Sequence, residues 1–234
     1  MTSEITLTYQ TRLRLDQRQQ AILDECASLL SLVERSLFAE TAKGEKTSSC
    51  KNAFLKLYGI TARQFNACRV SLEGKIAACK TFISQGITSL KQQLDSLEKK
   101  IKLLEKKPSK RFVLHQKKRR HNILSYRLSC LQNDQKNDRI HLCFGGKKLF
   151  RKQYNLEENG FTSHEQWKEA WHAKRNSEFF VLGSKDETAG NQTCVATQKD
   201  GSLSLRLRLP RALEEKFGKF LEIENVHFAY GQEA

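Results

Sequence analysis

The chain has 234 residues, a mass of 27.0 kDa and a formal net charge of +15 at pH 7. Its length and its 38% of hydrophobic residues suffice for one large domain or two small ones with a buried core. The seven cysteines are odd in number and form no C-x-x-C pair, which argues against a secreted disulfide framework and a zinc ribbon. We expect reduced, mostly buried thiols. With no secretory signal pattern and no apolar run near the ~20 residues that span a bilayer, we expect a cytoplasmic protein without a membrane partner.

The amino-terminal residues predict a strand followed by helices. Apolar and polar side chains alternate over residues 5–15, as in a half-buried strand. Asp16 is a favourable N-cap, and the apolar residues after it recur at helical spacing to about residue 40, so we expect a long amphipathic helix. A short helix is predicted over residues 50–58, with Gly59 as its C-terminal cap.

A second long helix is predicted to begin at Thr61 and to continue to about residue 83. Leucine and isoleucine then recur at spacings of three and four over residues 87–105, which predicts one arm of an antiparallel helical hairpin. Pro108 ends that arm. The returning helix is expected to end near residue 131 and to bury Ile123, Leu124, Leu128 and Leu131.

The tip and the returning arm carry the densest positive charge in the chain. No carboxylate occurs between Lys106 and Asp134. The cations in this stretch are Lys106, Lys107, Lys110, Arg111, Lys117, Lys118, Arg119, Arg120 and Arg127. Such a run repels itself, and a polyanion such as a phosphate backbone relieves that repulsion. The alternative is a solvated, partly disordered basic linker.

Short β-type runs follow Asn133. They cover residues 139–146, 178–191, 193–210 and 220–230, with a helix inserted near residues 163–174. Trp167 and Trp171 lie four apart on that helix, as in a core stripe. Asp-Gly at 200–201 favours a hairpin that places Arg206 and Arg208 on one face, either as a nucleic-acid contact or as a plain amphipathic sheet face. The fold class expected is α+β.

Four blocks in this order, at residues 58–80, 140–154, 173–194 and 200–210, resemble one known family. The chain is similar, from about Ile5 to Ala234, to the amino-terminal half of the TnpB/OrfB proteins of bacterial insertion sequences. These are compact RNA-guided DNA nucleases related to type V CRISPR effectors. The resemblance implies a first wedge strand at 1–15, a helical recognition domain at 16–138, and a wedge β-barrel at 139–234 into which that helical domain is inserted.

The same resemblance implies a RuvC nuclease domain after the wedge, with three carboxylates that bind Mg²⁺. Nothing in the sequence fits that domain, since the acidic residues near the end are scattered in a short segment. We therefore expect no catalytic residue and no cofactor in this chain. The expected chain is either a truncated gene product or a binding half whose RuvC domain is missing or separately encoded.

The resemblance implies a guide RNA and double-stranded target DNA as partners. Lys75 is expected to bind nucleic acid, without a more specific role. Side chains expected to grip nucleic-acid backbones are Lys117, Lys118, Arg119, Arg120, Arg127, Lys147, Lys148 and Arg151. Those expected to read a DNA motif from the helix after Thr61 are Arg63, Gln64, Asn66 and Arg69. Those expected at the barrel rim and on its surface are Lys174, Arg175, Lys185, Arg206 and Arg208.

Two other functions remain open at this point. The chain could be a nuclease-dead descendant that represses by RNA-guided occupancy of DNA. It could also be a free-standing, structural RNA-binding helical protein with no DNA target. For the polar residues after Thr61, ordinary helix surface polarity is the alternative interpretation.

Overall fold

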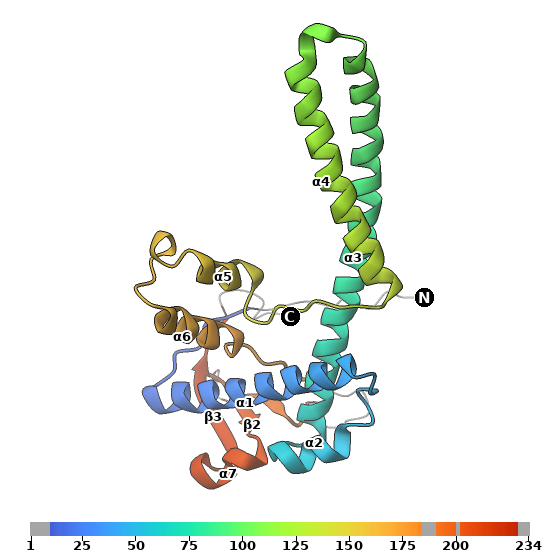
Figure 1. Cartoon of the computed structure of the whole chain (residues 1–234). Coiled ribbons are helices and arrows are strands. Elements are labelled where there is room, and N and C mark those ends of the chain that lie inside the picture. The colour runs from blue at the N-terminus through green and yellow to red at the C-terminus, as the bar shows by residue number, and fades with distance from the viewer. Residues whose placement is uncertain (1–9, 184–190, 200–201, 229–234) are drawn as a thin grey trace. The chain divides into compact units, whose positions relative to one another are not determined.

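A computed structural model of the chain describes residues 10–183, 191–199 and 202–228. The chain forms two compact units (Figure 1). Met1–Leu72 together with Cys143–Ala234 make one unit, here called the body, and Glu73–Leu142 make the other, here called the hairpin. The division differs from the predicted domains, which grouped residues 16–138, because the first helices pack with the sheet.

Two helices of the body begin and end as the sequence predicts. Helix α1, Gln17–Ala42, starts at Asp16, whose side chain accepts a hydrogen bond of 2.7 Å from the Gln19 backbone nitrogen, while the Gln19 side chain accepts one of 3.1 Å from Asp16. This is a capping box. Helix α2, Lys51–Tyr58, ends at Gly59, which takes the left-handed conformation with φ 57°.

Helix α3, Ala62–Glu105, begins in the body at a second capping box. The Thr61 hydroxyl accepts a hydrogen bond of 3.2 Å from the Gln64 backbone nitrogen, and the Gln64 side chain accepts one of 2.9 Å from Thr61. Thr61 therefore caps this helix, as predicted. The helix continues without a break through residues 84–86, where two separate helices were expected. The reason is that a single glycine, Gly86, costs only about 1 kcal/mol in a helix interior and does not end it.

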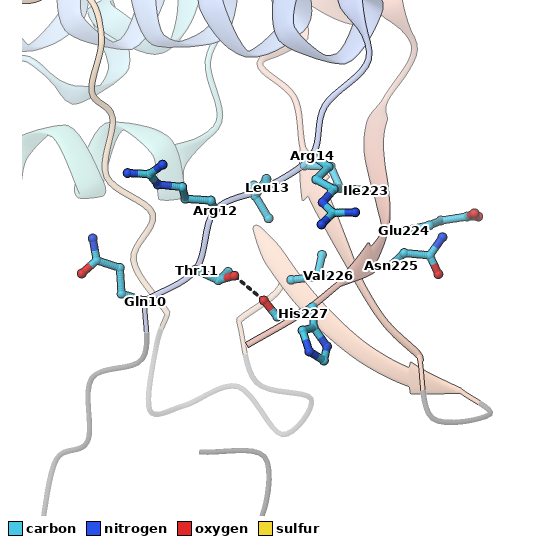
Figure 2. A pocket seen from close by; sticks show the side chains of 10 residues that line it. All are labelled: Gln10, Thr11, Arg12, Leu13, Arg14, Ile223, Glu224, Asn225, Val226 and His227. Carbon is cyan, nitrogen blue, oxygen red and sulfur yellow. Dashed lines mark hydrogen bonds between the residues drawn. The ribbon is translucent and has the colours of Figure 1, made fainter. Parts of the chain in front are cut away.

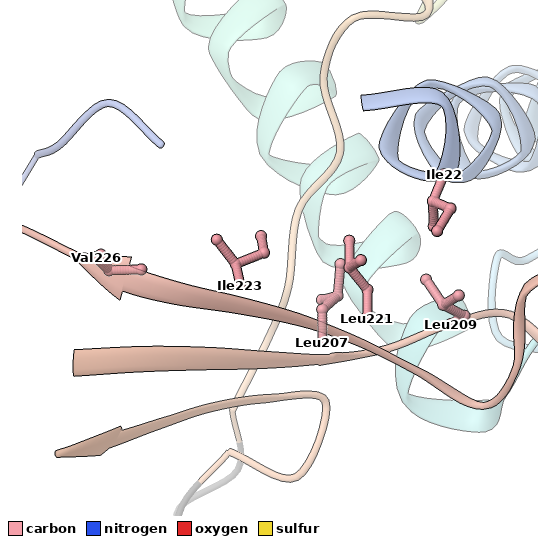
Figure 3. Close-up of a cluster of buried hydrophobic side chains, with 6 residues drawn as sticks. All are labelled: Ile22, Leu207, Leu209, Leu221, Ile223 and Val226. Carbon is pink, nitrogen blue, oxygen red and sulfur yellow. The ribbon is translucent and has the colours of Figure 1, made fainter. Parts of the chain in front are cut away.

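A small antiparallel sheet forms the other layer of the body. Its order is β1, Cys194–Lys199, then β2, Ser202–Arg208, then β3, Phe220–Val226, with helix α7, Arg211–Phe217, between the last two strands. The α+β class and the hairpin around residues 200–201 are confirmed. One face of the sheet is apolar and packs under α1. Figure 3 shows this cluster, which consists of Ile22, Leu207, Leu209, Leu221, Ile223 and Val226.

The predicted closed barrel is wrong for the described residues, whose three strands form an open sheet. Residues 139–146 and 178–183 are not strands. Residues 10–15 are not in a strand either, and residues 5–9 of the predicted first strand lie outside the described residues. Leu13, Leu15, Phe179 and Val181 nevertheless pack against the core of the sheet. Alternation in a sequence reports that one face is buried, whereas a strand also needs a backbone partner.

A segment rich in aromatic residues precedes the sheet. It contains α5, Lys147–Arg151, two 3₁₀ turns at Lys152–Tyr154 and Glu157–Asn159, and α6, His164–Arg175. The two tryptophans of α6 stack with their ring centroids 6.0 Å apart. Trp167 is buried and donates a hydrogen bond of 2.9 Å to the Leu149 carbonyl. The tryptophan pair therefore packs as a core stripe, as expected.

In the hairpin unit, α3 returns through a 3₁₀ turn at Pro108–Lys110 into α4, Arg111–Lys136 (Figure 1). Leu94, Leu97 and Leu124 are buried between the two helices, with Leu90, Ile101 and Leu128 beside them. The predicted hairpin is confirmed in its turn and its seam. The prediction that Ile123 is buried is wrong, since it is 45% exposed. It directly precedes Leu124 and so points to another side of the helix.

Truncation of Leu37 tests the burial of α1. Leu37 is 0% exposed and Leu32, on the same helix, is 44% exposed. Leu37→Ala should lower the free energy of unfolding by about 2–5 kcal/mol, because it leaves a cavity in the core. Leu32→Ala should change it by less than about 1 kcal/mol. Urea denaturation followed by circular dichroism measures both, and equal losses would contradict the burial of this face.

Gly59 tests the close approach of α7 to the end of α2. A methyl group on Gly59 would lie 2.9 Å from the Ala212 side chain, whereas nothing lies within 4 Å of the same position on Gly44. Both glycines have positive φ, so alanine strains the backbone at each. Gly59→Ala should therefore cost about 1–3 kcal/mol more than Gly44→Ala in thermal or urea unfolding. Equal costs would show that Ala212 does not approach this closely.

Candidate nucleic-acid interface

Most of the cation run predicted to meet a polyanion lies on a folded helix, and Lys106, Lys107 and Lys110 lie in the turn before it. Residues 111–136 form α4, whose leucines pack on α3, so the segment is no disordered linker. The predicted contact residues Lys118, Arg119, Arg120 and Arg127 are exposed, and Lys117 is half-buried. Helical geometry spreads these cations around α4, so the two sides of the seam carry different cations.

On one side of the seam, cations meet carboxylates from α3. The Lys118 ammonium lies 2.7 Å from a carboxylate oxygen of Glu105. One turn further along, Nε2 of His121 lies 3.2 Å from Glu98. We call this side of the hairpin the paired flank. On this flank the charge of Lys118 is offset within the protein.

On the other side lies a groove with a volume of about 330 Å³. Three cations line it, Lys100 from α3 and Lys117 and Arg120 from α4. Leu97 and Leu124 form its apolar base. Among the described residues, none of the three cations is paired with a carboxylate, and no carboxylate lines the groove.

The remaining groove residues are uncharged hydrogen-bonding side chains of α3. They are Ser89, Gln92, Gln93 and Ser96. With Lys100 they recur at spacings of three and four, so they lie on one side of that helix. Sequence reasoning about the cation run missed them, because the run is on α4. The available signal was the absence of Asp and Glu from these spacings on α3.

Four side chains near the start of α3 were predicted to read DNA, and they differ in their exposure to solvent. Gln64 is 4% exposed, and its amide nitrogen donates a hydrogen bond of 3.0 Å to the Arg208 carbonyl while its amide oxygen caps α3. Contrary to expectation, it cannot reach into a DNA groove, because both ends of its amide are already bonded inside the body. Arg63, Asn66 and Arg69 are half-buried on the same helix, and Lys75, in the hairpin unit, is exposed.

A second group of predicted cations lies on α5 and α6 of the body. Lys147, Lys148 and Arg151 are exposed along α5. Lys174 is exposed but lies 3.6 Å from the Glu178 carboxylate, which offsets its charge. The structure thus brings the three α5 cations together on one short helix. Lys185 lies outside the described residues.

Arg175, at the end of α6, is held differently from the lysines. Its Nε is buried and has no hydrogen-bond partner among the described residues. The neighbouring Arg35 donates a hydrogen bond of 2.8 Å to the side chain of Asn176. Burial and, after it, the charge of Arg175 lower the pKa of Arg35, while Glu34 opposes the shift. Two guanidinium groups therefore share a partly desolvated place, which favours an anion nearby.

The two arginines of β2 lie on one face, as expected from their alternation. Their guanidinium carbons lie 4.9 Å (Arg206) and 5.5 Å (Arg208) from the centre of the Phe220 ring. Arg208 also bonds Glu214 at 2.8 Å and is partly buried. Arg206 is exposed and has no carboxylate partner in the described part of the chain. Of the pair, Arg206 is the one able to meet a phosphate.

A hollow of about 1110 Å³ lies between residues 10–14 and β3 of the body (Figure 2). The Thr11 hydroxyl donates a hydrogen bond to the His227 carbonyl across it. Its lining mixes the cations Arg12 and Arg14 with the carboxylate Glu224. Because both signs of charge are present, this hollow is less selective for an anion than the groove of the hairpin.

Among the described residues, the cysteines form no disulfide bond and belong to no group that could hold a metal ion. All seven are free, and only Cys26 and Cys68 are buried, so the expectation of mostly buried thiols is wrong. Burial raises the pKa of Cys26 to about 12, which keeps it protonated at neutral pH. Within the described ranges, no group of three or more His, Cys, Asp or Glu side chains is placed to hold a metal ion.

Comparison of the chain with protein-family models, with curated proteins and with solved structures gives no match. In the described part of the chain, no helix combines the length and the apolar character required to cross a membrane.

Proposed function

We propose that the chain binds RNA through the hairpin, as the guide-RNA and DNA binding portion of a TnpB/OrfB-like RNA-guided endonuclease. One observation carries the proposal. The cations of α4 far outnumber the carboxylates near them, and two of them converge with Lys100 of α3 on a groove whose lining contains no acidic residue. A polyanion is the partner that such a surface fits.

The charge balance of the hairpin supports a nucleic acid over a small anion. Residues 106–133 contain only basic and uncharged side chains, and among their lysines and arginines only Lys118 has a carboxylate partner, Glu105 of α3, in the described part of the chain. A single small anion neutralises one or two charges, whereas a polynucleotide neutralises many and releases its condensed counterions. The gain in entropy from those counterions makes the interaction strong at low salt.

The other predicted contacts follow from the resemblance. In such a complex the protein grips the guide RNA and the RNA–DNA hybrid by their backbones and reads only a short DNA motif itself. The exposed cations Lys147, Lys148 and Arg151 suit backbone contact, because it needs charge in number and little geometric precision. The partners proposed are a guide RNA and double-stranded target DNA.

The hydrogen bonds that Gln64 makes inside the body favour a second candidate function, that of a structural RNA-binding protein with no DNA target. One of the four side chains expected to read DNA is occupied within the body. Binding of duplex DNA distinguishes the two functions. The purified protein loaded with a guide RNA should retain a matching duplex and release a mismatched one if the first function holds. Equal retention of both duplexes, or of neither, would favour the structural function.

Removal of four cations from α4 tests RNA binding. Replacing Lys117, Lys118, Arg119 and Arg120 with Gln should make the slope of log Kd against log salt shallower by about two to three units, because each neutralised phosphate contributes about 0.7 for a single strand. The slope is measured by fluorescence anisotropy with a labelled structured RNA.

A matched variant tests whether the position of the removed positive charges matters or only their number. Four lysines of the body, outside the proposed contacts, are replaced with Gln, namely Lys43, Lys46, Lys51 and Lys56. This variant has the same net charge as the α4 variant and should keep a slope within about one unit of the unmodified protein. If both variants shift the slope equally, α4 is not the contact. If the unmodified protein does not bind RNA at low salt, the proposed function is refuted.

A further inference from the structure

We propose that the groove between α3 and α4 holds the sugar–phosphate backbone of one single-stranded RNA segment. Lys100, Lys117 and Arg120 would contact phosphates, and the uncharged side chains of α3 would contact sugar hydroxyls. The inference rests on the proposed RNA binding, but it assigns the contact to one side of the hairpin. It also adds residues of α3 that the cation run does not contain.

Charge distinguishes this groove from the paired flank. Lys118 lies 2.7 Å from Glu105, so a phosphate arriving there has to displace or tolerate a carboxylate. Lys117, the adjacent residue, lines the groove and has no carboxylate partner in the described chain. A phosphate in the groove gains the full attraction of three cations and meets no repulsion from its lining.

The small size of the groove favours one strand. Its volume is about 330 Å³ and its base is the leucine seam, so a single backbone can lie in it, whereas a duplex would rest on the outer surface of both helices. Leu97 and Leu124 form that apolar base. Arg127 follows Arg120 by seven residues, two turns along the same side of α4, and extends the line of charge.

The uncharged lining favours RNA and backbone contact. Gln92, Gln93 and Ser96 present amide and hydroxyl groups, which bond phosphate oxygens and the 2′-hydroxyl that DNA lacks. None of the described residues that line the groove is aromatic. Bases therefore find no stacking partner there, and the groove should bind strands with little preference for sequence.

The first experiment compares two triple variants of the full chain. The groove variant carries Lys100→Gln, Lys117→Gln and Arg120→Gln. The matched variant carries the same loss of charge from the same two helices, at exposed lysines outside the groove, Lys91→Gln, Lys102→Gln and Lys136→Gln. Binding is measured by anisotropy with labelled oligouridine, with a fully paired RNA hairpin and with oligothymidine of the same length, and circular dichroism checks the fold of each variant.

The groove variant should bind oligouridine at least about tenfold more weakly than the unmodified protein, and the matched variant within about threefold. The loss should be smaller for the RNA hairpin. The unmodified protein should bind oligothymidine more weakly than oligouridine. Equal losses in both variants would overturn the assignment of the RNA contact to the groove. They would not contradict RNA binding by the protein unit formed by α3 and α4. A loss confined to the RNA hairpin would overturn the single-stranded assignment.

A single substitution of Gln by Glu provides an independent test, because it adds a negative charge and barely alters the shape of the side chain. Gln93→Glu places one carboxylate in the groove, and Gln85→Glu places one on the same helix outside its lining. Gln93→Glu should weaken oligouridine binding several-fold more than Gln85→Glu, because only the first brings a negative charge beside the bound phosphates. Equal effects would overturn the proposal. Absence of RNA binding by the unmodified protein would instead refute the proposed function itself.

Discussion

The apolar seam between α3 and α4 is the contact on which the charge distribution of the hairpin depends. Leu94, Leu97 and Leu124 are buried in it, and each contributes about 1.5–3 kcal/mol on burial. That gain opposes the mutual repulsion of the α4 cations. Without the seam, the same residues would be scattered over a solvated chain. With it, helical geometry assigns each cation to a fixed side of a rigid element, which is what makes a directed surface possible.

The seam also separates two electrostatic environments a few residues apart. On the paired flank, Glu98 and Glu105 of α3 face His121 and Lys118 of α4. On the groove side, α3 contributes serine and glutamine instead of carboxylates. The ion pair between Lys118 and Glu105 reduces the positive field on one flank, whereas no carboxylate in the lining of the groove offsets its three cations. The carboxylates of the paired flank and the uncharged side chains of the groove thus lie on different sides of the same two helices.

Local chemistry explains why much of the helical fold could be predicted. Asp16, Thr61 and Gly59 act through hydrogen bonds or backbone conformation within a few residues, so their roles are visible in the sequence alone. The strands were harder to predict than the helices. Leu13 and Leu15 alternate with Arg12 and Arg14 because the leucines pack on the sheet's core, but neither leucine lies in a strand. A periodic pattern records the burial of a face and leaves the backbone partner undetermined.

The candidate site was only half predictable, because its second half depends on the register of the hairpin. The run of cations on α4 is conspicuous, but Lys100 joins Lys117 and Arg120 only where Leu97 faces Leu124. A shift of one helix along the other by a single turn, about 5.4 Å, would change which α3 residues face these cations. The length of the tip and the leucine seam fix that register jointly, and neither determines it alone. A binding surface shared by two helices is therefore encoded in their packing, whereas the charge that it uses is encoded in one of them.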